Sequence, residues 1–232
     1  MAFLWSVVFV IPLIFLSTLF FGVISLFTSG KFMMRPARLW ARSLLRIAGV
    51  RVKVEGLEKL TPGASYVFAS NHLSYMDTPV ILANIPADFR FMAKDGLFKI
   101  PLLGTHLSQA GHIPVPRSDP RAAVKTMTLA AESIRTRNIS LLIFPEGGRS
   151  HDGVLQPFKD GAAYIAIKAQ VPVVPLSISG THEILAMHSA TFHRGRVTLR
   201  IGNPISTNGL TLHDRKSVTE TARTSVSSNI AP

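Results

Sequence analysis

The stretch ASNHLSYMD, residues 69–77, marks the junction between a predicted strand and a predicted helix. The residues YVFA at 66–69 combine aromatic and β-branched side chains without a charge, which is typical of a buried strand. Residues 78–85 (TPVILANI) follow as a short predicted helix. In α/β folds, functional residues usually lie where a strand ends and a helix begins. His72 stands at such a junction and is therefore the first candidate functional residue.

His72 and Asp77 are close enough in sequence for one turn of chain to bring the carboxylate to the imidazole. An imidazole that an Asp holds through one ring nitrogen presents the other nitrogen as a proton acceptor. The chain contains no cysteine and no Gly-x-Ser-x-Gly motif, so such a base would act most simply on a hydroxyl of the substrate. The alternative interpretation is a structural histidine beside an Asp that caps the following helix.

The rest of the chain alternates between strand and helix patterns. Strands are predicted at residues 51–54, 66–70, 89–93, 112–115, 139–144, 173–178 and 196–201. Helices are predicted at residues 78–85, 97–109 with an interruption at Pro101, 121–135 and 161–169, and one loose helix is expected after residue 207. This alternation predicts an α/β fold with a mainly parallel, twisted sheet covered by helices.

Residues 1–30 contain no charged side chain and are rich in Leu, Phe, Val and Ile. A straight helix of this length would reach roughly 40 Å, whereas a hydrocarbon core is about 30 Å thick. The segment would therefore span a membrane with tilt, or bend at Pro12 and re-enter. A secretory signal peptide is the competing interpretation, but no basic region precedes the apolar run, which also exceeds the usual h-region of about 7–15 residues. We therefore expect an N-terminal membrane-anchoring helical segment.

Seven basic residues follow this segment before the first acid, Glu55: Lys31, Arg35, Arg38, Arg42, Arg46, Arg51 and Lys53. By the positive-inside tendency, this flank places the following domain on the cytoplasmic face of a membrane, the inner membrane in the case of a bacterium. Arg38, Arg42 and Arg46 share one face of a predicted helix that Gly49 ends. Such a helix can lie in the headgroup layer with its arginines on lipid phosphate, or pack on the domain as an ordinary surface helix.

The chain of 232 residues carries a formal charge of +12, with an isoelectric point near 10.7. This charge implies an anionic partner: nucleic acid, a membrane surface or a phosphorylated substrate. We do not expect nucleic acid, because no recognition motif accompanies the charge. The eight histidines show no ligand spacing, so no metal site is expected.

A second cluster, PEGGRS at residues 145–150, follows the predicted strand at 139–144. In a parallel sheet this loop and the His72 loop leave from the same edge, so they can face one pocket. Glycines let backbone N–H groups approach a phosphate closely, and Arg149 supplies a permanent forked cation. Glu146 is placed to order Arg149 or a substrate hydroxyl. A glycine-rich connection with a surface ion pair is the alternative.

The motif at Asn71, His72 and Asp77 and the run FPEGGRS at 144–150 resemble the first and third signature blocks of the glycerolipid acyltransferase family, the 1-acyl-sn-glycerol-3-phosphate acyltransferases. Two weaker blocks, GHIPVPR at 111–117 and VPVVPL at 171–176, occur in the matching order. The resemblance covers about residues 50–205. Together with the apolar segment and the basic flank, it predicts a membrane anchor at residues 1–30, an interfacial helix at 31–49, an acyltransferase domain at 50–206 and a polar C-terminal tail at 207–232.

The resemblance also implies the reaction. His72, oriented by Asp77, would take the proton from the sn-2 hydroxyl of lysophosphatidic acid, which attacks the thioester of acyl-CoA or acyl-carrier protein to form phosphatidic acid. No resident cofactor is implied. The residues implied in binding the acceptor's phosphate are Arg117, Glu146, Gly147 and Arg149, with Lys94, Asn71 and Gly148 as further candidates. The apolar residues 97–107 would either line an acyl-chain tunnel or form core.

Three positions depart from the family pattern. Gly148 stands where a Thr is usual, and Pro114 and Pro116 occupy the middle of the second block. These departures affect the identity of the acceptor more than the reaction, so another lysolipid or an ornithine-type lipid stays open as acceptor. A membrane-anchored thioester hydrolase and a basic lipid-binding module without catalysis are the remaining alternatives.

Overall fold

The computed structural model describes residues 2–27, 34–116 and 119–230 and contains one sheet of seven strands in the order β1-β7-β6-β2-β5-β3-β4. All neighbouring strands are parallel except the antiparallel pair β6 and β7. The strands are β1 (Val50–Glu55), β2 (Val67–Ser70), β3 (Phe89–Lys94), β4 (Ile113–Val115), β5 (Ser140–Ile143), β6 (Val173–Ser179) and β7 (Gly195–Ile201). The predicted α/β fold with a mainly parallel sheet is confirmed.

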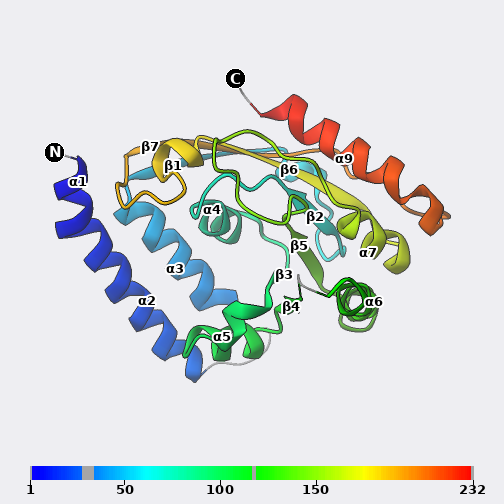
Figure 1. Ribbon diagram of the computed structural model, residues 1–232, viewed down its shortest axis with the longest axis horizontal. Helices are drawn as coiled ribbons and strands as arrows, with labels where there is room; N and C mark the ends of the chain where they lie inside the picture. The colour runs from blue at the N-terminus through cyan, green and yellow to red at the C-terminus, as the bar shows by residue number, and fades with distance from the viewer. Residues whose placement is uncertain (1, 28–33, 117–118, 231–232) are drawn as a thin grey trace.

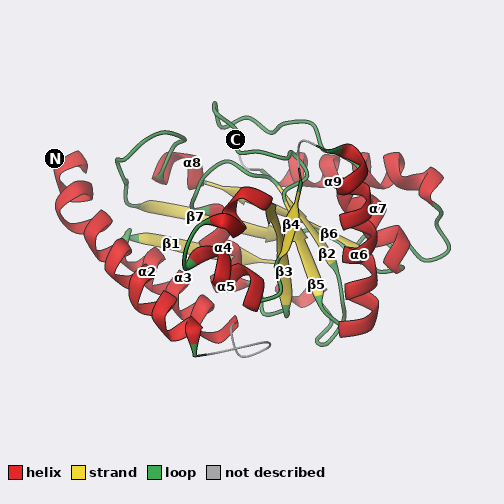
Figure 2. Ribbon diagram, turned by 60° about the horizontal axis from the view of Figure 1, so that its bottom comes forward, coloured by secondary structure: helices red, strands yellow, loops and turns green. Residues whose placement is uncertain are grey.

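Helices cover both faces of the sheet (Figure 1). One face packs against α3 (Met34–Ile47) and α4 (Asp77–Asn84). The other face packs against α6 (Pro120–Arg137), α7 (Gly161–Ala169) and α9 (Arg215–Asn229). Figure 2 shows the strands between these two groups of helices. The central strands β6, β2 and β5 are therefore buried on both sides, which explains their nearly continuous apolar sequences.

The N-terminal segment is one continuous helix built from α1 (Ala2–Trp5), a π-helical stretch (Ser6–Val10) and α2 (Ile11–Leu26). Pro12 has no N–H to donate, and a π-helical stretch lies immediately before it, where the hydrogen-bond ladder is interrupted. The helix touches the domain along one stripe, where Ser6 Oγ accepts the N–H of Phe192 at 2.8 Å and Trp40 Nε1 donates to Thr18 Oγ1 at 3.1 Å.

The remaining surface of this helix is apolar and exposed. Its uncovered side chains include Phe3, Leu4, Phe9, Phe15, Leu16 and Phe20. The stretch Ala2–Ile24 is long enough to cross a membrane, with a mean hydropathy of 2.7 and only 6% of its length buried. Such a surface is compatible with the expected membrane segment.

Helix α3 is held on the domain by two of its arginines. Arg38 Nη2 donates to the carbonyls of Ile85 and Ala87 at 3.0 and 2.6 Å, and Arg42 Nε donates to that of Ala83 at 3.4 Å. These carbonyls lie at the C-terminal end of α4, where a helix has unsatisfied acceptors and favours cations. Two arginines expected on lipid phosphate are thus bonded to protein, while Arg46 is exposed. Lys31 of the basic flank lies outside the described residues.

The C-terminal segment is a packed part of the domain. Helix α9 buries Val218, Ala222 and Val226 against the sheet and α7. Ser177 Oγ of β6 donates to the carbonyl of Val226 at 3.2 Å. The loose helix expected after residue 207 is instead docked, because three apolar residues at helical spacing complete the core on this face.

Candidate active site

The two loops singled out from the sequence meet at one edge of the sheet. β2 and β5 are adjacent and parallel, with Val67 opposite Leu141 and Ala69 opposite Ile143. The loops that follow these strands therefore leave from the same edge, as predicted. They are joined directly, because Ser150 N donates to the carbonyl of His72 at 2.8 Å.

His72 and Asp77 form a buried pair. Asp77 is the first residue of α4, and its Oδ2 lies 2.8 Å from His72 Nδ1. The same oxygen accepts the backbone N–H groups of Leu73 and Ser74 at 2.7 and 2.8 Å. Oδ1 accepts the hydroxyl hydrogen of Thr181 at 2.6 Å. Asp77 thus both organises the loop and orients the imidazole, which unites the two interpretations of this residue.

The imidazole is also fixed by stacking. Its ring lies 3.8 Å from that of Phe144, at an angle of 13°. With Nδ1 donating to Asp77, the lone pair of His72 is on Nε2, the nitrogen that a general base uses. Only 11% of the His72 side chain is exposed, so substrate must approach along one edge of the ring.

Glu146 supports the backbone of His72. Its Oε1 accepts the N–H of His72 at 2.6 Å, and its Oε2 accepts that of Gln156 at 2.9 Å. Burial raises the pKa of Glu146 to about 7, although the two backbone donors oppose this rise, and the nearby charge of Asp77 adds to it. Since both oxygens accept backbone N–H groups, the geometry gives Glu146 a structural task, and its contact with the acceptor's phosphate stays a prediction.

Arg149 bridges the two loops. Its guanidinium carbon lies 3.9 Å from the centre of the Tyr75 ring, a cation–π contact. Gly147 forms the turn before it, with φ of +80° and its N–H donated to the carbonyl of Phe144 at 3.0 Å. Gly148 borders open space, because no atom lies within 4 Å of the position where a Cβ would stand. This turn therefore offers glycine backbone and a cation beside the imidazole.

Asn71 lies behind the site. It is fully buried, its Nδ2 donates to the carbonyl of Ile178, and its Oδ1 accepts the N–H of Ile178, both at 2.8 Å. The side chain thereby extends the pairing between β2 and β6 beyond the last strand residue. Both ends of the amide bond Ile178, so the structure gives Asn71 a scaffolding task, and its role in substrate binding stays a prediction. Arg117, the other expected phosphate ligand, lies outside the described residues.

Two residues of the site were missed in the sequence. Thr181 orients Asp77 from the segment after β6, and no local pattern indicates this contact. Lys159 lies against the turn at Gly147, where an added Cβ would stand 2.8 Å from its Nζ. Lys159 precedes the first turn of α7, where a cation is unfavourable. A lysine at such a position could have indicated a functional residue.

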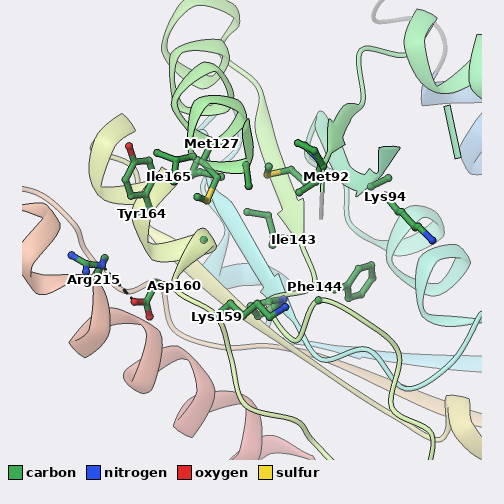
Figure 3. Close-up of a pocket in the computed structure, with 18 of the residues that line it drawn as sticks. Met92, Lys94, Met127, Ile143, Phe144, Lys159, Asp160, Tyr164, Ile165 and Arg215 are labelled. Carbon is green, nitrogen blue, oxygen red and sulfur yellow. Dashed lines mark ion pairs between the residues drawn. The ribbon is translucent and has the colours of Figure 1, made fainter. Parts of the chain in front are cut away.

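A cavity of about 560 Å³ opens beside this site, and its lining includes Lys94, Phe144, Gly147 and Lys159 (Figure 3). Lys94, a substrate-binding candidate, thus lines the same cavity as the loop that contains Phe144 and Gly147. Among residues 2–27, 34–116 and 119–230, no three His, Asp or Glu side chains converge as metal ligands would.

Comparison with known proteins places both loops inside one family match. The acyltransferase family model matches residues 51–179. Residues of this chain are 37% identical over 171 positions to the chloroplastic 1-acyl-sn-glycerol-3-phosphate acyltransferase BAT2 of Brassica napus, covering 73% of this chain and 49% of that protein. They are 31% identical over 193 positions to the human 1-acyl-sn-glycerol-3-phosphate acyltransferase alpha, covering 83% and 68%. The chain spans about half the length of the chloroplastic relatives that it matches.

A solved structure shares the fold. The crystal structure of the 1-acyl-sn-glycerophosphate acyltransferase PlsC from Thermotoga maritima superposes with a TM-score of 0.72 at 30% sequence identity. The match covers 85% of this chain and 80% of the other.

Proposed function

We propose that this chain, which belongs to the acyltransferase family, transfers an acyl chain to the sn-2 hydroxyl of 1-acyl-sn-glycerol-3-phosphate. The product would be phosphatidic acid, an intermediate of phospholipid biosynthesis. The activity for which its relatives are named supports this acceptor. The single observation that carries the proposal is the buried pair of His72 and Asp77. Its Nδ1 and Oδ2 atoms lie 2.8 Å apart.

In the proposed reaction, His72 Nε2 accepts the proton of the sn-2 hydroxyl. The oxygen attacks the carbonyl carbon of the thioester, a C–O bond forms and the C–S bond breaks. The leaving thiolate then takes the proton from the imidazolium, so His72 returns to its neutral form. A positioned base of this kind contributes roughly 10²–10⁴-fold in rate.

Asp77 stabilises the imidazolium that forms and keeps the ring in the productive tautomer. Its oxygens accept hydrogen bonds from His72, Leu73, Ser74 and Thr181, so the carboxylate cannot turn away during the reaction. Because all of these donors come from the chain itself, the base is organised before substrate arrives.

The acceptor's phosphate is assigned to the glycine turn and its cations. Arg149, held on Tyr75, and the backbone at Gly147 and Gly148 face the same loop junction as His72. Arg117 and Lys94 complete the proposed set. The formal charge of +12 favours the approach of such an anionic lipid.

The proposed donor is acyl-CoA or acyl-carrier protein, which acts as a co-substrate. The proposed location is a membrane, with the catalytic domain on its cytoplasmic face. The exposed apolar surface of α1 and α2 and the basic residues that follow support this placement. The bilayer would also supply the acceptor, since a lysolipid partitions into it.

The test is a product analysis with labelled acyl-CoA in detergent or liposomes. Lysophosphatidate, a zwitterionic lysophospholipid and an ornithine-type lysolipid are compared as acceptors. Labelled phosphatidate formed from the first, with little product from the others, is the expected result. Labelled free fatty acid without a lipid product would instead identify a hydrolase, and a strong preference for another acceptor would overturn the assignment of lysophosphatidate.

A further inference from the structure

The cavity beside the site lies between α6, α7 and strands β3 and β5, and its wall is predominantly apolar (Figure 3). The lining side chains include Met92, Met127, Ile143, Tyr164 and Ile165. Its volume of about 560 Å³ is that of a small-molecule site. The apolar residues 97–107, expected as a possible tunnel wall, do not line this cavity.

Phe144 connects the cavity to the base. It lines the cavity, and its ring also stacks on His72 at 3.8 Å. Phe144 is therefore shared between the cavity wall and the packing of the imidazole. Pro145 and Gly147, from the same loop, form the adjoining part of the wall.

Lys159 supplies a cation at this end of the cavity. Its backbone N–H donates to the carbonyl of Pro145 at 2.9 Å, which fixes the residue against the loop. The neighbouring Asp160 is paired with Arg215 at 3.5 Å (Figure 3). Within the described part of the chain, no carboxylate lies within 4.0 Å of Lys159 Nζ, so its charge is not neutralised by a salt bridge.

We infer that this cavity binds the acyl chain already carried by the lysophospholipid acceptor, and that Lys159 joins the cations that hold the acceptor's phosphate at the Gly147 turn. The inference rests on the proposed function and names a binding site for the acceptor in it. An apolar wall with Lys159 at the end that adjoins the Gly147 turn matches an amphiphile with one aliphatic chain and one anionic group.

The position of the charge identifies the acceptor and not the donor. In lysophosphatidate, the phosphate ester and the reacting hydroxyl are on adjacent glycerol carbons, so a cation near the base meets the phosphate. In an acyl donor, the thioester is uncharged and the phosphates lie at the far end of the pantetheine arm. The anionic group at Lys159 and the chain in the cavity therefore belong together on the acceptor.

The chain-binding part is tested with Met127→Trp, which fills the cavity from α6. Met127 Sδ stands 3.2 Å from the Cβ position of Gly161, so there is no room to turn away. The control is Leu129→Trp on the same helix, at a side chain that is 53% exposed and outside the lining. Dissociation constants for oleoyl and octanoyl lysophosphatidate are measured in a His72→Ala background, and KM values in the otherwise unchanged protein.

Met127→Trp is expected to raise the dissociation constant of oleoyl lysophosphatidate by about tenfold, which is the cost of excluding roughly two methylenes from the cavity. Met127→Trp should bind octanoyl lysophosphatidate as tightly as the unchanged protein does, and Leu129→Trp should bind both ligands so. These unchanged affinities also show that the variants fold. An unchanged dissociation constant for oleoyl lysophosphatidate in Met127→Trp, the same loss for both ligands, or an altered preference for the chain of the acyl donor instead would overturn the inference.

The charge is tested with Lys159→Met, and Lys216→Met on the exposed face of α9 is the control for net charge. Lys159→Met should raise the dissociation constant of lysophosphatidate by about tenfold, the scale of a charge-assisted hydrogen bond. Binding of the phosphate-free monoacylglycerol should not change. Equal losses in the two lysine variants would overturn this part. If the protein binds oleoyl lysophosphatidate as described but forms no phosphatidate, the proposed function fails and the cavity assignment stands.

Discussion

Thr181 donates its hydroxyl hydrogen to Asp77 Oδ1 at 2.6 Å, across 104 positions of sequence. Both residues are fully buried. Thr181 follows β6 and Asp77 follows the β2 loop, so this contact ties the orientation of the base to the neighbouring strand. The geometry of the catalytic pair is thus set by the sheet as well as by its own loop.

Replacing Thr181 by Val should lower kcat by up to about a hundredfold, because a small misplacement of the base suffices for such a loss. KM for lysophosphatidate should change little, since Thr181 does not face the cavity. Stability should fall by about 1–3 kcal/mol because Asp77 Oδ1 loses a buried donor. Thr181→Ser keeps the hydroxyl and should restore kcat; a Ser variant as slow as the Val variant would remove this hydrogen bond from the account.

Glu146 should make the protein less stable as pH rises. Its pKa is about 7 in the folded chain, against an ordinary value of 4.5, so the folded state binds the extra proton between these values. Its contribution to stability is therefore complete below about pH 4.5 and lost as pH rises through about 7. Melting temperatures of the wild type and Glu146→Gln at pH 5 and pH 8 check this. The melting temperature of the variant should rise relative to that of the wild type at the higher pH. A difference in melting temperature that does not depend on pH would contradict the raised pKa of Glu146. Glu132→Gln, at an exposed site, is the control.

Tyr75 should act through Arg149. The cation–π contact at 3.9 Å is worth about 0.5–1 kcal/mol at an exposed site, which corresponds to a two- to fivefold change in binding. Tyr75→Leu should therefore raise KM for lysophosphatidate by that factor and leave kcat unchanged, whereas Tyr75→Phe retains the ring. Steady-state kinetics with the wild type and the two variants test this prediction. A KM of Tyr75→Phe as high as that of Tyr75→Leu would show that the aromatic ring does not cause the effect.

The arginines of α3 should separate into structural and surface residues. Arg38→Met should lower the free energy of unfolding by about 1–3 kcal/mol, because the carbonyls of Ile85 and Ala87 lose their charged donor. Arg46→Met removes the same charge from an exposed position and should leave the melting temperature unchanged. Binding to anionic vesicles should instead weaken for Arg46→Met. Equal destabilisation by both substitutions would mean that the Arg38 contacts contribute no stability.

The strands and the meeting of the two loops were predictable because the signals are local. Continuous apolar runs such as SLLI at β5 mark strands buried on both faces, and the parallel arrangement then brings the loops after β2 and β5 to one edge. The spacing of His72 and Asp77 indicated that they could pair, and the resemblance to the acyltransferase motif favoured the pair over a structural histidine.

The tasks of Glu146 and Asn71 were not predictable in the same way. Each was a candidate for contact with substrate, and the backbone groups that each bonds belong to a segment that becomes its neighbour only in the folded sheet. The docking of α9 has the same origin, since its few apolar residues are meaningful only beside α7 and β6. Polar side chains with short motif spacing indicate a site, but tertiary packing decides which of them face the substrate.

The most direct test of the account is the turnover of His72→Ala in the acyl-transfer assay with lysophosphatidate. His213→Ala, at an exposed histidine, is the matched control. The account predicts that formation of phosphatidate falls by roughly 10²–10⁴-fold in His72→Ala while lysophosphatidate still binds, and that the control is unaffected. Phosphatidate formed by His72→Ala at the wild-type rate would contradict the assignment of His72 as the base.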